Sequence, residues 1–209
     1  PLRQASHGAA RGGTSRRSGA RGRAGRARSL AHDHQPVSGA GHGLVIGTSK
    51  TGKTTLAQLL CSERVADGFE AIVLDPFNGE WPTRHVYTDS QRFLEVARAS
   101  TRCLLVVDES GRAIGRGKQA RGMEWVTTQA RHWGHQALLI AQTPQQIDPT
   151  VRASAETAYV FRVGLAGAKL LAEELAQPGL LHAGSLGAFE YLVHVPCEPL
   201  RRQRLRLPR

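Results

Sequence analysis

Residues 43–55 read GLVIGTSKTGKTT, and this stretch decides the fold. Its first four residues can form a short buried strand, and a helix is expected over Lys53–Ser62. Between them, Gly47–Thr54 matches the pattern G-x-x-x-x-G-K-[ST], which requires a strand before it and a helix after it. The glycines allow a tight turn whose backbone N–H groups point inward, and the helix N-terminus adds partial positive charge. The stretch therefore predicts a loop that binds nucleotide phosphates, a Walker A or P-loop.

Every residue of this loop is a candidate for ligand binding. Lys53 is expected to reach the β- and γ-phosphates, and the Thr54 hydroxyl is expected to bind Mg²⁺. The implied ligands are ATP and Mg²⁺. The binding residues that we expect are Gly47, Thr48, Ser49, Lys50, Thr51, Gly52, Lys53, Thr54 and Thr55.

Beyond the loop, apolar runs of strand length alternate with helical stretches. We expect strands at 71–74, 104–107, 137–140 and 159–163, helices at 90–99, 121–132 and 168–176, and a closing edge strand or hairpin at 187–195. Such alternation is typical of βαβ units and a parallel sheet. The predicted fold class is therefore α/β, a P-loop NTPase with a mostly parallel sheet flanked by helices.

The strand expected at 104–107 runs directly into two acids, Asp108 and Glu109. An acid at such a strand end holds the Mg²⁺ shell, the Walker B role, and we assign this role to Asp108. A second carboxylate beside it can orient or deprotonate an attacking water, so Glu109 is the candidate catalytic base. The pair favours an enzyme that hydrolyses ATP over a simple nucleotide switch.

Two further strands end in polar residues. Residues 72–81 read IVLDPFNGEW, a strand that ends in Asp75. Residues 130–144 read ARHWGHQALLIAQTP, in which an arginine-bearing helix turns into an apolar strand that ends at Gln142. A glutamine at the end of a strand beside the Walker B strand can place its amide next to the γ-phosphate. It can then report whether that phosphate is present.

With these parts the chain resembles the HerA–FtsK superfamily of DNA-pumping ATPases, and the fold that this implies is RecA/FtsK-like. The resemblance spans residues 43–195 and rests on the P-loop, the Asp75-Pro76 turn, Asp108-Glu109, the Arg131…Gly134…Gln142…Pro144 run and the strand that ends in Phe161-Arg162-Val163. The small size, without added domains, is most similar to the genome-packaging ATPases of tailless, membrane-containing icosahedral phages.

The resemblance implies roles for side chains and identities for partners. Gln142 corresponds to the sensor glutamine, and Arg131 to an arginine finger that acts on a neighbouring subunit's nucleotide. Arg152 and Arg162 are weaker candidates for this finger, and a structural ion pair explains Arg162 better. The protein would work as a homo-oligomeric ring, which we expect to be a hexamer, on double-stranded DNA. As a packaging motor it would be cytoplasmic in the host and would dock on a capsid vertex protein.

Three other functions fit parts of the same pattern. Zot-like filamentous phage assembly ATPases share the Arg–Gly–Gln–Pro run and act at a membrane. No apolar run approaches the roughly 20 residues that span a bilayer, so no integral membrane segment is expected, which weighs against this alternative. A nucleotide-dependent DNA-binding protein with little turnover would also use a P-loop, although Glu109 argues against it. A small-molecule kinase lacks the signature of a second substrate site.

Positive charge is concentrated toward the ends of the chain. The 209 residues carry 28 Lys and Arg against 17 Asp and Glu, a net charge of +11. Residues 1–38 hold eight arginines and one acid, and residues 199–209 hold five arginines and no acid. We therefore expect a disordered Arg/Gly-rich tail at 1–38, a P-loop ATPase domain at 39–198 and a basic C-terminal tail at 199–209.

A further basic stretch, residues 110–122, follows the Walker B acids and reads SGRAIGRGKQARG. Its four basic residues stand among glycines without any acid. Such a loop can grip DNA phosphates in the pore of a ring, or it can be an ordinary solvated surface loop. The absence of interleaved aromatic residues suits contacts with the backbone rather than base stacking.

Overall fold

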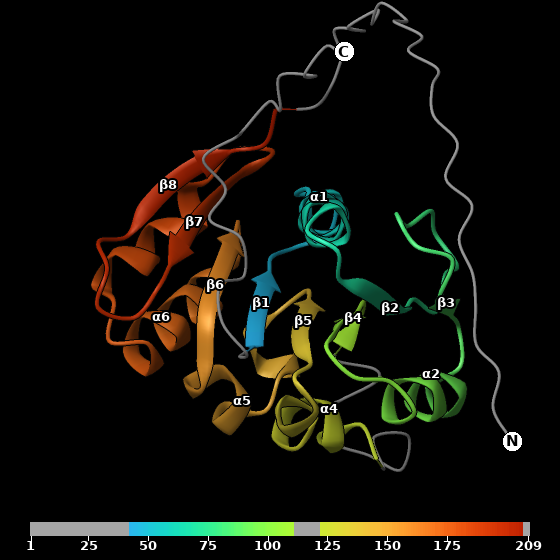
Figure 1. The fold of residues 1–209 in the computed structure, drawn as a ribbon. Coiled ribbons are helices and arrows are strands. Elements are labelled where there is room, and N and C mark those ends of the chain that lie inside the picture. The colour runs from blue at the N-terminus through green and yellow to red at the C-terminus, as the bar shows by residue number, and fades with distance from the viewer. Residues whose placement is uncertain (1–41, 111–121, 207–209) are drawn as a thin grey trace, which may run out of the picture. The chain divides into compact units, whose positions relative to one another are not determined.

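The computed structural model describes residues 42–110 and 122–206. These residues form one eight-stranded sheet in the order β3-β2-β4-β5-β1-β6-β7-β8 (Figure 1). The strands are β1 (His42–Ile46), β2 (Glu70–Leu74), β3 (Val86–Tyr87), β4 (Cys103–Val107), β5 (Gln136–Ala141), β6 (Ala155–Phe161), β7 (Glu190–His194) and β8 (Arg201–Arg204). The α-helices are α1 (Lys53–Ala66), α2 (Ser90–Arg98), α4 (Glu124–Thr128), α5 (Pro149–Ala153) and α6 (Leu165–Glu174), and the 3₁₀ helices are η2 (Ala130–Trp133), η3 (Pro144–Gln146) and η4 (Pro178–Ser185). The predicted α/β fold is confirmed.

The sheet is parallel over its first six strands. β1 lies between β5 and β6 and runs parallel to both, β4 is parallel to β5 and β2, and β2 is parallel to β3. β7 and β8 complete the sheet in antiparallel orientation. Because parallel strands point the same way, the residues that follow β1, β2, β4, β5 and β6 gather at one edge, where ligands bind in folds of this kind.

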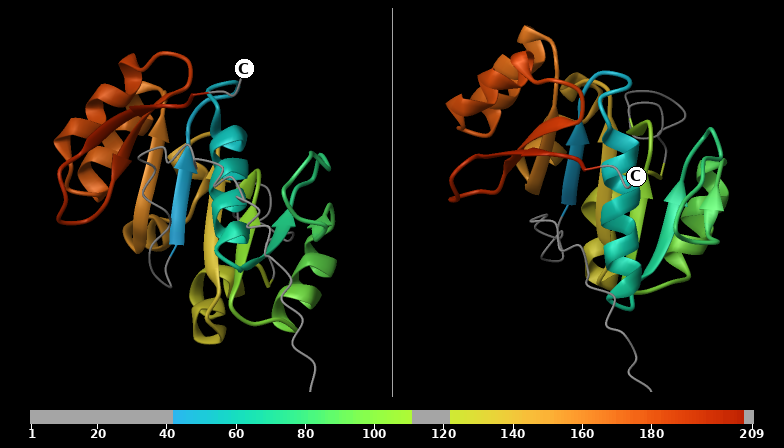
Figure 2. Two further views of the ribbon diagram at one scale, coloured as in Figure 1. Left: turned by 45° about the horizontal axis from the view of Figure 1, so that its top comes forward. Right: turned by 90° about the horizontal axis from the view of Figure 1, so that it is seen from above.

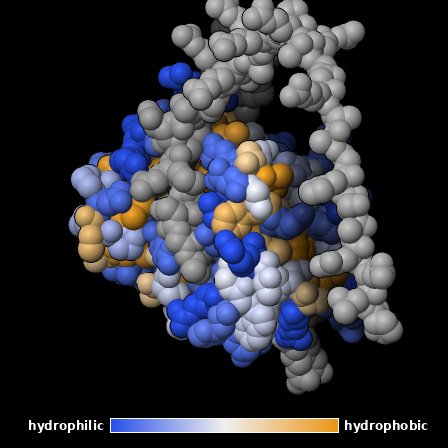
Figure 3. Space-filling view, viewed as in Figure 1, coloured by the Kyte–Doolittle hydropathy of each residue, from blue (hydrophilic) through white to orange (hydrophobic). Residues whose placement is uncertain are grey.

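Apolar layers cover both faces of the sheet. The side chains of Leu44 and Ile46 belong to one layer and that of Val45 to the other, as the alternation of a strand requires. Helix α1 lies across one face, and the other helices lie on the opposite face (Figure 2). The central strands β1, β2, β4 and β5 are largely apolar because both of their faces are covered, whereas β8, at the edge of the sheet, is not. In the orientation of Figure 1, the surface formed by the described residues is largely hydrophilic, with apolar residues interspersed (Figure 3).

The helix that we expected over 121–132 is broken in two. Helix α4 ends at Thr128, and η2 is followed by Gly134, whose φ of 76° lies in the left-handed region. The hydroxyls of Thr127 and Thr128 both donate to the carbonyl oxygen of Glu124, over 3.1 and 2.7 Å. Local hydrogen bonds of this kind compete with those of a regular helix, and β-branched residues are poor helix formers.

Other elements differ from the expected ones at their ends. Strand β6 begins at Ala155 and ends at Phe161, whereas we expected 159–163. It starts earlier because its first residues pair with the start of β1. Helix α1 continues to Ala66, and α6 covers Leu165–Glu174 rather than 168–176.

The C-terminal segment contributes to the sheet. We expected residues 199–209 to be a basic tail, whereas Arg201–Arg204 form β8, which pairs with β7. Leu205, directly after β8, is buried. Strand β8 rather than β7 is therefore the edge strand, because paired backbone groups and one buried side chain outweigh the charge of the segment.

Two expectations fall outside the described residues: the tail at 1–38 and, except for its two end residues, the basic loop at 110–122. Among the helices of residues 42–110 and 122–206, none combines the length and apolar character needed to cross a bilayer.

Candidate functional site: a phosphate-binding loop beside two acids and a glutamine

The phosphate-binding loop joins β1 to α1 through two glycines that tolerate no side chain. A Cβ atom on Gly47 would lie 2.5 Å from Cβ of Phe161. Gly52, the N-cap of α1, has a φ of 107°, and a Cβ atom on it would lie 2.8 Å from the ring of Phe189. Strand β6 and the residues that precede β7 therefore pack directly against the loop.

Hydrogen bonds within the loop give it a preformed shape. The ammonium group of Lys53 donates to the carbonyl oxygen of Thr48 over 3.0 Å, and the Thr51 hydroxyl donates to the same oxygen over 2.8 Å. Burial lowers the pKa of Lys53, and the nearby carboxylates of Asp108 and Glu109 partly offset this shift. The two carboxylates thus balance only part of the cost of burying the positive charge of Lys53. A nucleotide phosphate bound here would neutralise that charge.

A hydroxyl and a carboxylate face each other beside the loop. The Thr54 hydroxyl, in the first turn of α1, lies 3.4 Å from Oδ2 of Asp108, which directly follows β4. These hard oxygen donors fit Mg²⁺, which binds one or two protein groups together with substrate phosphates and waters. Thr54 and Asp108 would hold Mg²⁺, and the bound ion would supply positive charge next to the phosphates.

Asp108 is buried at a cost to stability. Burial raises the pKa of its carboxyl above the usual range, and the negative charges of Asp75 and Glu109 raise this pKa further. The hydrogen bond from the backbone N–H of Glu109 and the positive charge of Lys53 lower it in part. An acid whose pKa is raised on folding destabilises the folded state once the pH exceeds its unfolded pKa.

We therefore expect Asp108→Asn to raise the melting temperature of the nucleotide-free protein at pH 8. The gain should shrink as the pH falls toward about 4, where the unfolded aspartate also becomes protonated. Thermal unfolding at a series of pH values measures this, with Asp67→Asn, an exposed acid at the end of α1, as the matched control. A lower melting temperature for Asp108→Asn at pH 8 would contradict the prediction.

Gln142 and Glu109 are brought together from two strands. The side-chain amide of Gln142, directly after β5, donates to Oε1 of Glu109 over 2.7 Å. The hydroxyl of Ser49 in the P-loop donates to Oε1 of Gln142 over 3.3 Å. Glu109 has a φ of 49°, a left-handed backbone that is strained for a residue with a side chain. A continuous chain of hydrogen bonds thus links the P-loop to the candidate base.

Gln146 holds the backbone next to Gln142, and no sequence argument singled it out. Its side-chain oxygen accepts from the backbone N–H groups of Gln142, over 2.9 Å, and Thr143, over 3.1 Å. The signal that could have found it is the capping-box spacing T-x-x-Q, from Thr143 to Gln146.

Arg152 binds the turn that follows β5 and contains Gln146. Its side chain is 3% exposed and pairs with both carboxylate oxygens of Glu174, each over 2.5 Å. It also donates to the carbonyl oxygens of Pro144, over 2.7 Å, and Ile147. We considered Arg152 as an arginine finger; because its guanidinium is buried and makes four hydrogen bonds within its own chain, the structure does not support that role.

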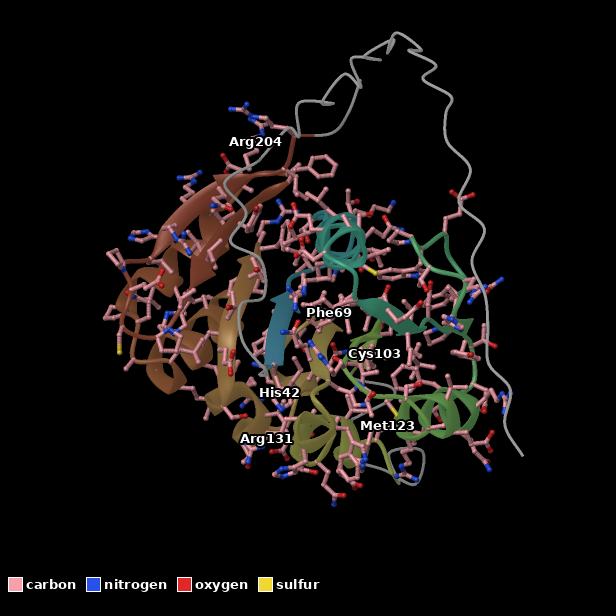
Figure 4. All side chains as sticks on the ribbon, in the orientation of Figure 1. His42, Phe69, Cys103, Met123, Arg131 and Arg204 are labelled. Atoms are coloured by element: carbon pink, nitrogen blue, oxygen red, sulfur yellow. The ribbon has the colours of Figure 1, made fainter. Side chains whose placement is uncertain are left out.

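Arg131 lies far from the P-loop of its own chain. It is exposed in η2, which precedes β5, whereas the P-loop follows β1 at the opposite edge of the sheet. Figure 4 shows Arg131 next to His42, at the start of β1. Any action of Arg131 on a nucleotide would therefore have to be on that of a neighbouring subunit.

Arg162 lies beside the P-loop, directly after β6. Its carbonyl oxygen accepts from the backbone N–H of Thr48, over 2.9 Å, and from the Thr48 hydroxyl, over 3.2 Å. We favoured a structural ion pair for its side chain, but within the described residues Arg162 has no acidic partner. A pocket of about 700 Å³ opens here, lined by Thr48, Ser49, Gln142, Thr143, Arg162 and Gly164 among others.

Asp75 shapes the turn that follows β2. One carboxylate oxygen accepts from the backbone N–H of Phe77, over 2.8 Å; the other accepts from the backbone N–H of Gly79, over 2.7 Å, and the indole N–H of Trp81, over 3.0 Å. The Asp-Pro-x-x-Gly-x-Trp stretch is therefore a turn organised around one buried carboxylate. It lies at the same sheet edge as Asp108, because β2 pairs with β4.

Fold and site together define the class: the protein is a P-loop ATPase of the FtsK/HerA-like group. A family model described as Zonular occludens toxin (Zot) matches residues 45–171, and the chain belongs to this family. No curated protein sequence gives a significant match.

Solved structures with the same fold include proteins with different described roles. The genome packaging NTPase B204 from Sulfolobus turreted icosahedral virus 2, in complex with AMPPCP, superposes with a TM-score of 0.66 at 16% identity, over 81% of this chain and 100% of that chain. The pCW3 conjugation coupling protein TcpA with ATPγS gives 0.61 at 14% identity, over 79% of this chain and 60% of that chain. The N-terminal domain of zonular occludens toxin from Neisseria meningitidis gives 0.51 at 14% identity, over 80% and 94%.

Proposed function

We propose that the protein is an ATPase that drives double-stranded DNA through a ring of identical subunits. The observation that carries this proposal is the convergence of the P-loop, Asp108, Glu109 and Gln142 at one sheet edge, with Gln142 bonded both to Ser49 and to Glu109. A nucleotide switch has no need of a carboxylate placed to accept a proton from water. The added carboxylate and amide support water attack on the terminal phosphate.

Each group has a distinct task in the proposed hydrolysis. The P-loop N–H groups and Lys53 bind the phosphates, while Thr54 and Asp108 hold Mg²⁺. Glu109 accepts a proton from the attacking water. Gln142 orients Glu109 and responds to the terminal phosphate, because its amide already joins the loop to the base. As the water attacks, the bond between the γ-phosphorus and its bridging oxygen breaks and ADP leaves.

The ring and its substrate extend this proposal. Arg131 would reach the nucleotide of the next subunit in a hexamer, because it is exposed and lies at the opposite edge of its own sheet. The basic segments at 1–38 and 110–122 would contact DNA phosphates. The motor domain, expected at 39–198, would extend through β8, which belongs to the same sheet. The likeness to a viral packaging NTPase over that protein's full length supports genome packaging into a capsid, docked on a vertex protein in the host cytoplasm.

A second candidate function follows from the family itself. The match to the Zot family over residues 45–171 favours a Zot-like ATPase that assembles phage or transfers DNA at a membrane. Such an enzyme would use the same hydrolytic site. As a phage-assembly enzyme it would not need duplex DNA, whereas duplex DNA is expected to stimulate the packaging motor.

The test is steady-state ATP hydrolysis by the purified chain with and without linear double-stranded DNA. We expect DNA to stimulate turnover, and Lys53→Ala to lower it by about 10²-fold or more, because the phosphates lose their main charged partner. Lys169→Ala, on α6, is the matched control, and its turnover with and without DNA should equal that of the unmodified chain. Turnover that ignores DNA would favour the Zot-like alternative, and tight ATP binding without turnover would reject the motor.

A further inference from the structure

Arg162 is held at a fixed position next to the P-loop by its backbone rather than its side chain. Strand β6 pairs with β1, so the residue after β6 stands beside the start of the loop. Two hydrogen bonds from Thr48 to the carbonyl oxygen of Arg162 fix this arrangement. The guanidinium is consequently free to serve a ligand.

The side chain of Arg162 is exposed and unpaired in the described part of the chain. It borders the pocket of about 700 Å³ beside the P-loop, and it is the only charged residue among the described residues that line it. The other polar lining groups are the hydroxyls of Thr48, Ser49 and Thr143 and the amide of Gln142. A pocket with one cation, several hydrogen-bond donors and no acid suits an anion.

The pocket adjoins the groups to which we assign hydrolysis. Ser49 and Gln142, which bond to each other, both line it, and Gln142 also bonds to Glu109. A terminal phosphate that reaches past Lys53 toward these groups would meet Arg162 of the same chain. Arg152 is unable to take this place because Glu174 engages it, and Arg131 lies at the far edge of the sheet.

We propose that Arg162 binds the terminal phosphate of the ATP held by its own subunit and stabilises the charge that develops there during hydrolysis. This inference rests on the proposed ATPase function and adds a cation in cis to the one expected from a neighbouring subunit. The arginine stays protonated throughout, because its role is electrostatic and not acid–base.

The first test compares two nucleotides. Arg162→Ala should weaken binding of a non-hydrolysable ATP analogue roughly 10- to 100-fold, the effect of losing a hydrogen bond to a charged group, while ADP binding stays the same. Arg162→Lys should restore part of the loss. Equal weakening for both nucleotides would indicate a structural role, and no weakening for either would also overturn the proposal. Thermal unfolding verifies that the variants fold.

The second test separates action in cis from action in trans. Chains with Lys53→Ala and with Arg162→Ala are co-expressed with different tags and purified through both, so that every oligomer contains both. If Arg162 serves its own subunit, each site keeps one defect and turnover remains low. Recovery of turnover would overturn the proposal, because it requires an arginine supplied by the neighbour.

A control pair of variants shows whether mixing can restore a site that two subunits share. Arg131→Ala paired with Lys53→Ala should regain turnover, since Arg131 is expected to act on a neighbour. If the purified chain is a monomer, the comparison of the two nucleotides decides, because an arginine of another chain is then absent. Failure of the proposed function is seen separately, as tight ATP binding by the unmodified chain without turnover, with or without DNA; the comparison of the two nucleotides can still be made on such a chain.

Discussion

Glu109→Gln is expected to lower ATP turnover by about 10²- to 10⁴-fold, the usual contribution of a general base. The substitution keeps the shape of the side chain and leaves an oxygen that can accept the 2.7 Å hydrogen bond from Gln142. What it removes is the ability to take a proton from water. Binding of ATP should therefore persist, and the variant should accumulate bound ATP.

Steady-state hydrolysis and equilibrium binding of an ATP analogue, measured on the same preparation, test this separation. Glu95→Gln is the matched control, because Glu95 is an exposed acid on α2. Its turnover should equal that of the unmodified protein. Near-normal hydrolysis by Glu109→Gln would exclude Glu109 as the base.

Arg152→Met is expected to lower the free energy of unfolding by about 3 kcal/mol, the lower end of the range for breaking a buried ion pair. The substitution removes the partner of the Glu174 carboxylate and of the Ile147 carbonyl, while the Pro144 carbonyl keeps the backbone N–H of Ile147. The lower end applies because the Glu174 side chain is 26% exposed and keeps some contact with water. Urea unfolding gives the value directly.

Two further variants show whether the buried pair is responsible. Arg92→Met breaks an exposed pair with Glu95, on the surface of α2, and should cost less than about 1 kcal/mol. Arg152→Met combined with Glu174→Leu should recover part of the stability, because no charge is left unpaired. A loss below about 0.5 kcal/mol for Arg152→Met alone, which is the range of ordinary surface changes, would contradict the assignment.

The P-loop and the central strands could be predicted from sequence because each is marked by a pattern in neighbouring residues. The glycine-lysine pattern of 47–54 follows an apolar run, and the apolar runs that became β4 and β5 end in Asp108 and Gln142. Once the fold is known to be a parallel sheet, these strand ends must meet at one edge. The confirmed fold class follows from that pattern alone.

Features that depend on distant residues left no such signal. Arg152 was read as a candidate finger because its partner, Glu174, lies on another helix and its carbonyl partners belong to a turn. Strand β8 has arginine at three of its four positions, so its charge concealed its pairing with β7. The pocket beside Arg162 exists only because β6 returns to the side of β1.

The central place of β1 has a consequence for how the chain folds during synthesis. Residues 42–46 are made first among the described strands, yet they pair with 137–141 and 155–160. Pairing over such sequence separations is slow, and it leaves an apolar segment without partners in the meantime. The P-loop receives its last contacts later still, when Phe189 donates to Thr51 and Leu205 donates to Phe189. A ribosome-bound chain that ends before residue 205 would therefore present the nucleotide-binding motif without the packing that shapes it.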